Sequence, residues 1–110
     1  MKLPDAELAV VPRAKVTDYL LSETHPPGRA KARVFVACGF DRAEPELFEE
    51  ALVTVARTGN VIDVQPTPYG TKYVVEGDLG GSVAASLTVR TVWIIEKTGD
   101  APRLVTAYPI

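Results

Sequence analysis

A lone histidine and two cations form a potentially reactive group in the first half of the chain. His25 is followed by Arg29 and Lys31, where the chain turns into a predicted helix. Imidazole has an unperturbed pKa near neutrality and suits a general acid or base, while the cations suit an anionic substrate. The alternatives are a structural histidine and a solvated basic helix face. Lys31 lies at the edge of the apolar stripe, where it either snorkels into water or reaches over the sheet toward a phosphate.

A second group lies in the last strand predicted from the sequence. Residues 103–110 alternate apolar with hydroxyl-bearing side chains, as a half-buried strand does, and place Thr106 and Tyr108 on one face. An ordinary closing strand needs neither residue there. A metal-independent nuclease would use both, because it must hold a phosphate with hydroxyl and cationic donors.

A third group depends on how two long strands pair. A three-residue turn at Gly80–Ser82 pairs Leu79 with Val83 and separates apolar from polar side chains, which a two-residue turn does not. This register sets Lys72 directly opposite Arg90. Like charges opposite each other in a sheet repel, so the pair predicts an anion site. The alternatives are side chains that splay into water, or a register that is in error.

Aromatic residues extend the candidate substrate surface. Tyr69, Trp93 and Tyr108 can stack on unpaired bases. Strict alternation gathers the last two on one face with other hydroxyl and aromatic residues, namely Thr71, Tyr73, Thr91 and Thr106. The opposite face is also apolar at this end, so the sequence leaves open which face the helices cover. A bulge near Arg90 would reconcile the two patterns.

Three helices are expected to precede the strands. Pro12 begins a helix that ends near residue 21, Thr24 caps a second that ends at Gly39, and Pro45 begins a third that ends at Gly59. In the second helix the predicted apolar face consists of Ala30, Val34, Ala37 and Cys38. In the third it consists of Leu47, Phe48, Ala51, Leu52 and Val55.

The strands are expected over residues 61–65, 71–79, 83–96 and 103–108, with turns at Gly80–Ser82 and Thr98–Asp100. The order of elements predicts an α+β fold in which three N-terminal helices pack on a four-stranded antiparallel meander. With 110 residues, we expect a single domain over 1–110.

Composition excludes several classes of protein. The net charge of −2 and the sequence pI near 5.3 disfavour broad electrostatic binding of nucleic acid. No apolar run approaches the ~20 residues of a membrane span, no signal peptide is recognisable, and Cys38 alone cannot form an internal disulfide. A cytoplasmic location is therefore expected. One histidine and one cysteine do not make a usual zinc site, so we expect no metal, and no motif implies a cofactor.

Four segments carry a resemblance that spans almost the whole chain. They are THPPGRAK at 24–31, PTPYGTKY at 66–73, TVW at 91–93 and PRLVTAYP at 102–109. Together they resemble an uncharacterised family of small bacterial proteins. More distantly, helices followed by a four-stranded meander with a VTAYP-like last strand are similar to the barnase–EndoU–RelE class of metal-independent ribonucleases, many of which are toxins of toxin–antitoxin pairs.

This distant resemblance implies roles for particular residues. The class places a His or Lys on the helical half, a cation on an early strand and a Ser, Thr or Tyr on the last strand. Those roles would fall to His25 and Lys31, to Lys72, and to Thr106 with Tyr108. The acidic pI departs from the class, whose members are commonly basic.

Two hypotheses follow from the sequence. The first is a ribonuclease toxin in which His25, Lys31, Lys72 and Thr106 are catalytic and Arg29, Tyr69, Arg90, Trp93 and Tyr108 bind RNA. The second is a non-catalytic interaction domain, an antitoxin, immunity or assembly module, that binds a neighbouring gene's product. The sequence leaves open the RNA specificity, the partner and the oligomeric state.

Overall fold

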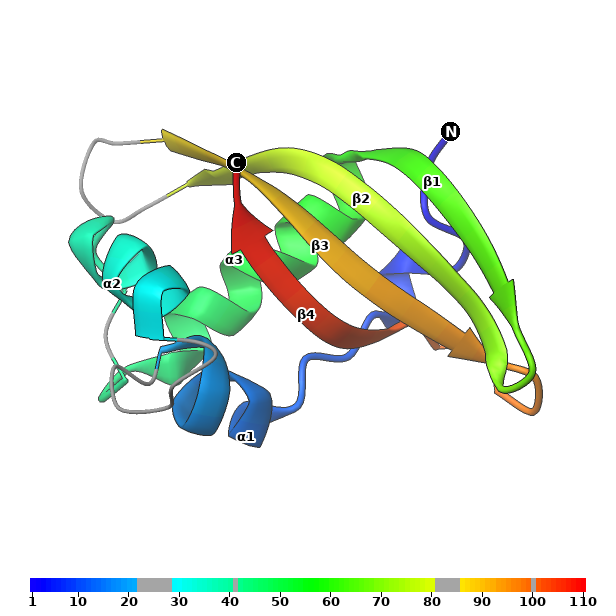
Figure 1. Ribbon diagram of the computed structural model, residues 1–110, viewed down its shortest axis with the longest axis horizontal. Helices are drawn as coiled ribbons and strands as arrows, with labels where there is room; N and C mark the ends of the chain where they lie inside the picture. The colour runs from blue at the N-terminus through cyan, green and yellow to red at the C-terminus, as the bar shows by residue number, and fades with distance from the viewer. Residues whose placement is uncertain (22–28, 41, 81–85, 100) are drawn as a thin grey trace.

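A four-stranded sheet covered on one side by helices makes up the computed structural model, which describes residues 1–110 except 22–28, 41, 81–85 and 100 (Figure 1). The helical segments are η1 (Ala6–Leu8), α1 (Arg13–Lys15), the π-helical turn η2 (Val16–Leu20), α2 (Arg29–Ala37) and α3 (Pro45–Thr58). The strands are β1 (Asn60–Thr67), β2 (Gly70–Gly80), β3 (Ser86–Glu96) and β4 (Arg103–Pro109), all antiparallel in the order β1-β2-β3-β4. The α+β prediction is confirmed. No helix within the described residues is long and apolar enough to cross a membrane.

Helix α3 is the helical element that the sequence specifies most clearly. Pro45 lies at its first position, and residue Gly59 follows its last turn. Lys2 Nζ donates to the carbonyls of Thr58 and Gly59 at 2.6 and 3.2 Å, so a cation meets the negative end of the helix dipole. The predicted stripe is confirmed at Phe48, Leu52 and Val55, which are fully buried, while Leu47 is 42% exposed.

The predicted apolar face of α2 is wrong. Ala32 and Phe35 are the fully buried residues, whereas Val34 and Ala37 are exposed and Cys38 is only half-buried. The reason is the size of Phe35, whose ring packs on Phe48 with centroids 4.9 Å apart. Phe35 has the largest apolar area of any side chain on this helix, so the side that carries it turns toward the core. Gly39 ends the helix as predicted, with φ of 100°; the predicted cap at Thr24 lies outside the described residues.

The core lies between the helices and one sheet face. Trp93 is its largest side chain and is fully buried. Its indole Nε1–H donates to Thr91 Oγ1 at 2.7 Å, and that hydroxyl donates in turn to the Val75 carbonyl at 3.2 Å. Since a buried donor without a partner costs about 1–3 kcal/mol, this chain of bonds is what lets an indole and a hydroxyl share the core.

The predicted pairing of β2 with β3 is wrong by four residues. Leu79 pairs with Leu87, Lys72 pairs with Ile94 and Arg90 pairs with Glu76. Lys72 and Arg90 are therefore not opposite each other. The shift is an even number, so each side chain keeps the same sheet face, and apolar patterning alone cannot distinguish the two registers.

A bulge in β4 decides which face carries the C-terminal hydroxyls. Thr106 pairs with Val92, but Leu104 pairs with the next residue, Trp93, which leaves Val105 as an extra residue. Leu104 is buried with the core, and Thr106 and Tyr108 consequently lie on the opposite face. The predicted common face for Trp93, Thr106 and Tyr108 is therefore wrong, because strict alternation fails at the bulge.

Both edges of the sheet are covered in part. Along β1, Val61 N–H donates to the Met1 carbonyl at 2.8 Å, Val64 N–H donates to its neighbour Asp63 at 2.9 Å, and Pro66 has no N–H. Along β4, Leu104 N–H donates to the Val10 carbonyl at 3.0 Å. These contacts shorten the free edge that each outer strand presents to another strand.

Candidate functional site

The sheet face turned away from the helices gathers candidate groups from three strands (Figure 1). We call it the open face. It consists of three successive cross-strand rows: Glu76–Arg90–Tyr108, Val74–Val92–Thr106 and Lys72–Ile94–Arg103. The side chains opposite these, on β3 at Val89, Thr91 and Trp93, are fully buried in the core. Alternation along the strands thus places four predicted site residues on one surface: Lys72, Arg90, Thr106 and Tyr108.

The first row fixes a guanidinium. Arg90 Nε donates to Glu76 Oε2 at 3.1 Å, and the Arg90 side chain is 40% exposed. The hydrogen bond with Glu76 raises the pKa of Arg90 above its ordinary value, and the Tyr108 hydroxyl raises it further, while burial opposes both. The ion pair is too exposed to add much stability. The ion pair instead orients Arg90, because Glu76 holds the Nε edge of the guanidinium while the rest of the group faces solvent.

The second row contains an unsatisfied hydroxyl. Thr106 Oγ1 is the one side-chain polar atom in the described part of the chain that is buried and has no hydrogen-bond partner. Such a group costs about 1–3 kcal/mol, and valine would fill the same space without that cost. A native protein that keeps an unsatisfied polar group requires an explanation. Its neighbours in the row, Val74 and Val92, have apolar side chains that cannot form a hydrogen bond with the Thr106 hydroxyl.

The third row carries further cations on the same face. Lys72 is half-buried on β2 opposite Ile94, and Arg103 lies on the other side of Ile94, where it forms an ion pair with Glu96 at 2.8 Å. Thr106 lies in the row between Arg90 and Lys72, about 7 Å from each of their rows along the strands. Across the sheet, Arg90 is one strand from Thr106 and Lys72 is two strands away, which adds about 5 and about 10 Å. The three residues are therefore spread over the open face, where an extended anionic ligand would pass all of them.

Three of the predicted residues are not placed by the described structure. His25 lies outside the described residues. Arg29 and Lys31 belong to α2, but their side chains are not among those described. α2 packs against the covered face, where Ala32 and Phe35 are buried, and it comes close to β4, the edge strand that carries Thr106 on the opposite face. That the helical half reaches the open face around this edge is a prediction.

The remaining two predicted residues lie away from the open-face rows. Trp93 is fully buried in the core with its indole bonded to Thr91, so stacking on a base would require the core to open. Tyr69 lies in the β1–β2 turn and is 79% exposed. Its ring is available to a ligand at one end of the sheet.

Glu76 belongs to the candidate site but was not among the predicted residues. The signal was present in the alternation, since Glu76 and Arg90 fall on the same face in either register. Only the correct register shows that the two are direct neighbours. The predicted three-residue turn pairs Glu76 with Ser86, and in that register Glu76 and Arg90 are not direct neighbours.

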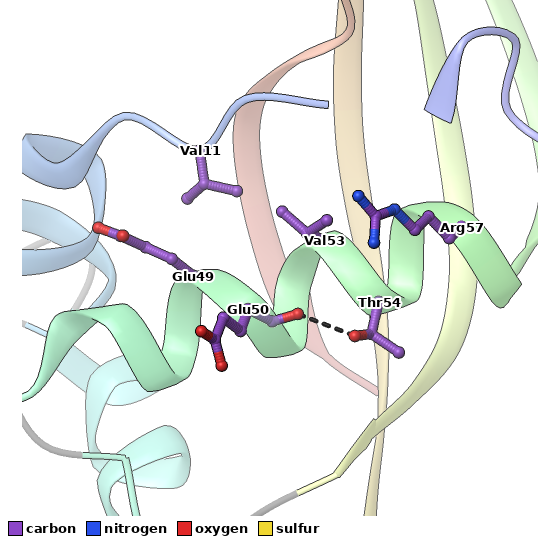
Figure 2. Close-up of a pocket in the computed structure, with 6 residues that line it drawn as sticks. All are labelled: Val11, Glu49, Glu50, Val53, Thr54 and Arg57. Atoms are coloured by element: carbon purple, nitrogen blue, oxygen red, sulfur yellow. Dashed lines mark hydrogen bonds between the residues drawn. The ribbon is translucent and has the colours of Figure 1, made fainter. Parts of the chain in front are cut away.

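A separate hollow lies on the helical side of the molecule. It has a volume of about 530 Å³ between the exposed side of α3 and the N-terminal segment, and is lined by Val11, Glu49, Glu50, Val53, Thr54 and Arg57. Figure 2 shows Val11 and Val53 facing each other and Arg57 at the far end. Thr54 Oγ1 donates to the Glu50 carbonyl at 2.9 Å, and Glu49 accepts from Arg13 at 3.0 Å. None of the predicted site residues lines this hollow.

Comparison with known proteins places the chain in a family. The model of a domain of unknown function, DUF6883, matches residues 2–110, and the chain therefore belongs to that family. The expectation that it belongs to an uncharacterised family is confirmed. No protein with a curated description matches the sequence.

A solved structure shares the fold. A chain of the contact-dependent growth inhibition toxin–immunity protein complex from Klebsiella pneumoniae 342 superposes with a TM-score of 0.74. The match covers 94% of this chain and 95% of that chain, with 16% sequence identity. At that identity the likeness establishes the architecture alone.

Proposed function

We propose that this DUF6883 domain is the toxin of a bacterial toxin–immunity pair, and that it cleaves RNA on its open face without a metal ion. The fold similarity to a chain of a toxin–immunity complex supports a role in such a pair. The distant resemblance to the barnase–EndoU–RelE class supports ribonuclease chemistry. The observation that carries the proposal is the placement of Arg90, Thr106 and Lys72 in three successive rows of one uncovered sheet face.

The chemistry begins with the ribose. The 2′-oxygen attacks the adjacent phosphorus while the bond from phosphorus to the 5′-oxygen breaks. His25 either takes the proton from the 2′-hydroxyl or gives one to the leaving oxygen. The phosphorane formed on the way carries extra negative charge. Donors aimed at that charge are worth most when they are fixed in advance, as in an oxyanion hole.

The open face would supply those donors. Lys72 and the Thr106 hydroxyl stabilise the phosphorane together with Lys31, and Arg90 binds a flanking phosphate from the geometry that Glu76 fixes. Rotation about χ1 gives the Thr106 hydroxyl, which has no partner in the described chain, access to an incoming oxygen. An open surface rather than a closed cavity suits a polymer such as RNA.

A second candidate function is that of the immunity partner. The net charge of −2 and the exposed carboxylates of α3 at Glu46 and Glu50 favour it, since nuclease toxins are commonly basic. In that case the open face would bind a protein and His25 would affect only stability. Expression in a bacterial host separates the two candidates, because a toxin stops growth and an immunity protein does not.

The direct test is RNA cleavage by the purified protein in EDTA, after removal of any bound partner. We expect cleavage by the wild type and strong loss of cleavage in His25→Ala and Lys72→Ala. Arg57→Ala is the matched control, because it removes an exposed cation from α3, on the helical side. Full activity in both site variants would refute the assigned roles. An inactive wild type that also leaves bacterial growth unaffected would refute the toxin proposal.

A further inference from the structure

The β1–β2 turn holds an exposed aromatic ring in a rigid frame. Tyr69 is 79% exposed, the highest value among the large exposed apolar or aromatic side chains of the described chain. Thr67 Oγ1 accepts from Tyr69 N–H and Gly70 N–H, both at 3.2 Å, and donates to the Gly70 carbonyl at 2.7 Å. The hydroxyl thus uses all its bonding capacity to fix the backbone of Tyr69 and Gly70.

Gly70 and the neighbouring hairpin restrict the turn further. Gly70 has φ of 155°, and a Cβ at that position would clash with the Ile95 carbonyl oxygen. Lys97 N–H donates to the Tyr69 carbonyl at 3.3 Å, which ties the start of the β3–β4 connection to the turn. We call Thr67–Gly70 together with Lys97 the hairpin tip. It lies at the end of the sheet that projects beyond α2 and α3 (Figure 1).

The charge at this end is opposite to that of the whole protein. Lys72, Lys97 and Arg103 lie here. Two carboxylates of the described residues lie near them: Glu96 pairs with Arg103 at 2.8 Å, and Asp63 on β1 accepts from Gln65, the cross-strand partner of Lys72, at 2.8 Å. Neither lysine has a carboxylate partner in the described part of the chain. An acidic protein therefore presents, at this end of its sheet, an exposed aromatic ring and two lysines that have no carboxylate partner among the described residues.

We infer that the hairpin tip is a nucleotide-binding subsite, in which Tyr69 stacks on an unpaired base and Lys97 binds its phosphate. An exposed ring fixed in advance loses little entropy on stacking, and base–aromatic stacking is sequence-tolerant because every base has a π face. The Lys72 row links the tip to Thr106 on the same surface. The inference rests on the proposed RNA ligand and extends the site by a nucleotide beyond the scissile phosphate.

The test measures binding by fluorescence anisotropy with a labelled adenosine oligoribonucleotide and with the same oligomer carrying abasic units. We expect the wild type to prefer the oligomer that has bases. Tyr69→Ala should weaken its binding about 5- to 150-fold, the range that one stacked base contributes, and should remove the preference. Tyr69→Phe should keep both. Lys97→Ala should lower the slope of log affinity against log salt by about 0.7, as for one lost phosphate contact on single-stranded RNA.

Ile62→Ala is the matched control, because Ile62 is an exposed apolar residue on β1 of the same hairpin, away from the tip. It should bind both oligomers as the wild type does. Unchanged affinity in Tyr69→Ala, with affinity lost in Arg90→Gln, would overturn the inference and leave the proposed function intact. Binding of neither oligomer by the wild type would instead count against the RNA ligand itself. A Tyr69→Ala defect confined to capture of a protein partner would also overturn the inference.

Discussion

Thr106 stands directly opposite Val92 on the uncovered face of the sheet, while Thr91, the residue before Val92, has its hydroxyl in the core. The two threonines differ in one respect that decides their roles. The Thr91 hydroxyl accepts from Trp93 and donates to the Val75 carbonyl, whereas the Thr106 hydroxyl has no partner in the described chain. One hydroxyl stabilises the fold, and the other is the group that we propose for binding the ligand.

Thr106→Val should abolish RNA cleavage without destabilising the protein. Valine replaces an unsatisfied buried hydroxyl with a methyl group of the same shape, so the free energy of unfolding should stay constant or rise by up to about 1 kcal/mol. Urea denaturation and a cleavage assay on the same sample check both parts. A large loss of stability would show that the hydroxyl has a structural bond, and full cleavage would remove it from the site.

Thr91→Val should have the opposite effect. It leaves the Trp93 indole N–H without an acceptor in the core, which should cost roughly 1–3 kcal/mol of unfolding free energy. The urea midpoint should fall while the denaturant slope stays unchanged. Cleavage per folded molecule should equal that of the wild type. Wild-type stability in this variant would mean that the indole finds another acceptor.

Arg90→Gln should weaken RNA binding most at low salt. Removal of one cation that contacts a phosphate lowers the slope of log affinity against log salt by about 0.7 for a single strand. Arg13→Gln is the control, because Arg13 pairs with Glu49 at 3.0 Å on the helical side, away from the open face. Equal slopes for the two variants would exclude Arg90 from the RNA contact.

The pH dependence of the cleavage rate should report the ionisation of His25. The hydrogen bond with Glu76 raises the pKa of Arg90 further, so Arg90 keeps its charge over the whole working pH range. An unperturbed histidine titrates near pH 6.5. The rate profile should therefore bend near neutrality and lose this bend in His25→Asn. A profile that the substitution leaves unchanged would assign the proton transfer to another group.

The sequence predicts best the elements in which the apolar pattern is compatible with only one buried face. In α3, Phe48, Leu52 and Val55 repeat at helical spacing between a proline and a glycine, and the structure matches both bounds and burial. In α2, small apolar residues surround the helix, so the position of one ring, Phe35, decides which side is buried. Periodicity carries no information about that choice.

The site was only partly predictable because it depends on two discrete features of the sheet. A shift of four residues between β2 and β3 leaves each side chain on the same face of the sheet. Alternation therefore cannot reveal that Arg90 pairs with Glu76. The extra residue Val105 moves Thr106 and Tyr108 to the face opposite Trp93, and no glycine or proline marks the bulge. The residue types were recognisable, but their neighbours were not.

The central claim is that RNA binds the open face, and amide chemical shifts measured by NMR during titration with a 2′-deoxy-substituted, uncleavable oligonucleotide test it most directly. We expect the largest shift changes at Lys72, Arg90 and Thr106, with little change along the exposed side of α3. Shift changes confined to α3 and the hollow beside Val11, or none at all, would contradict it.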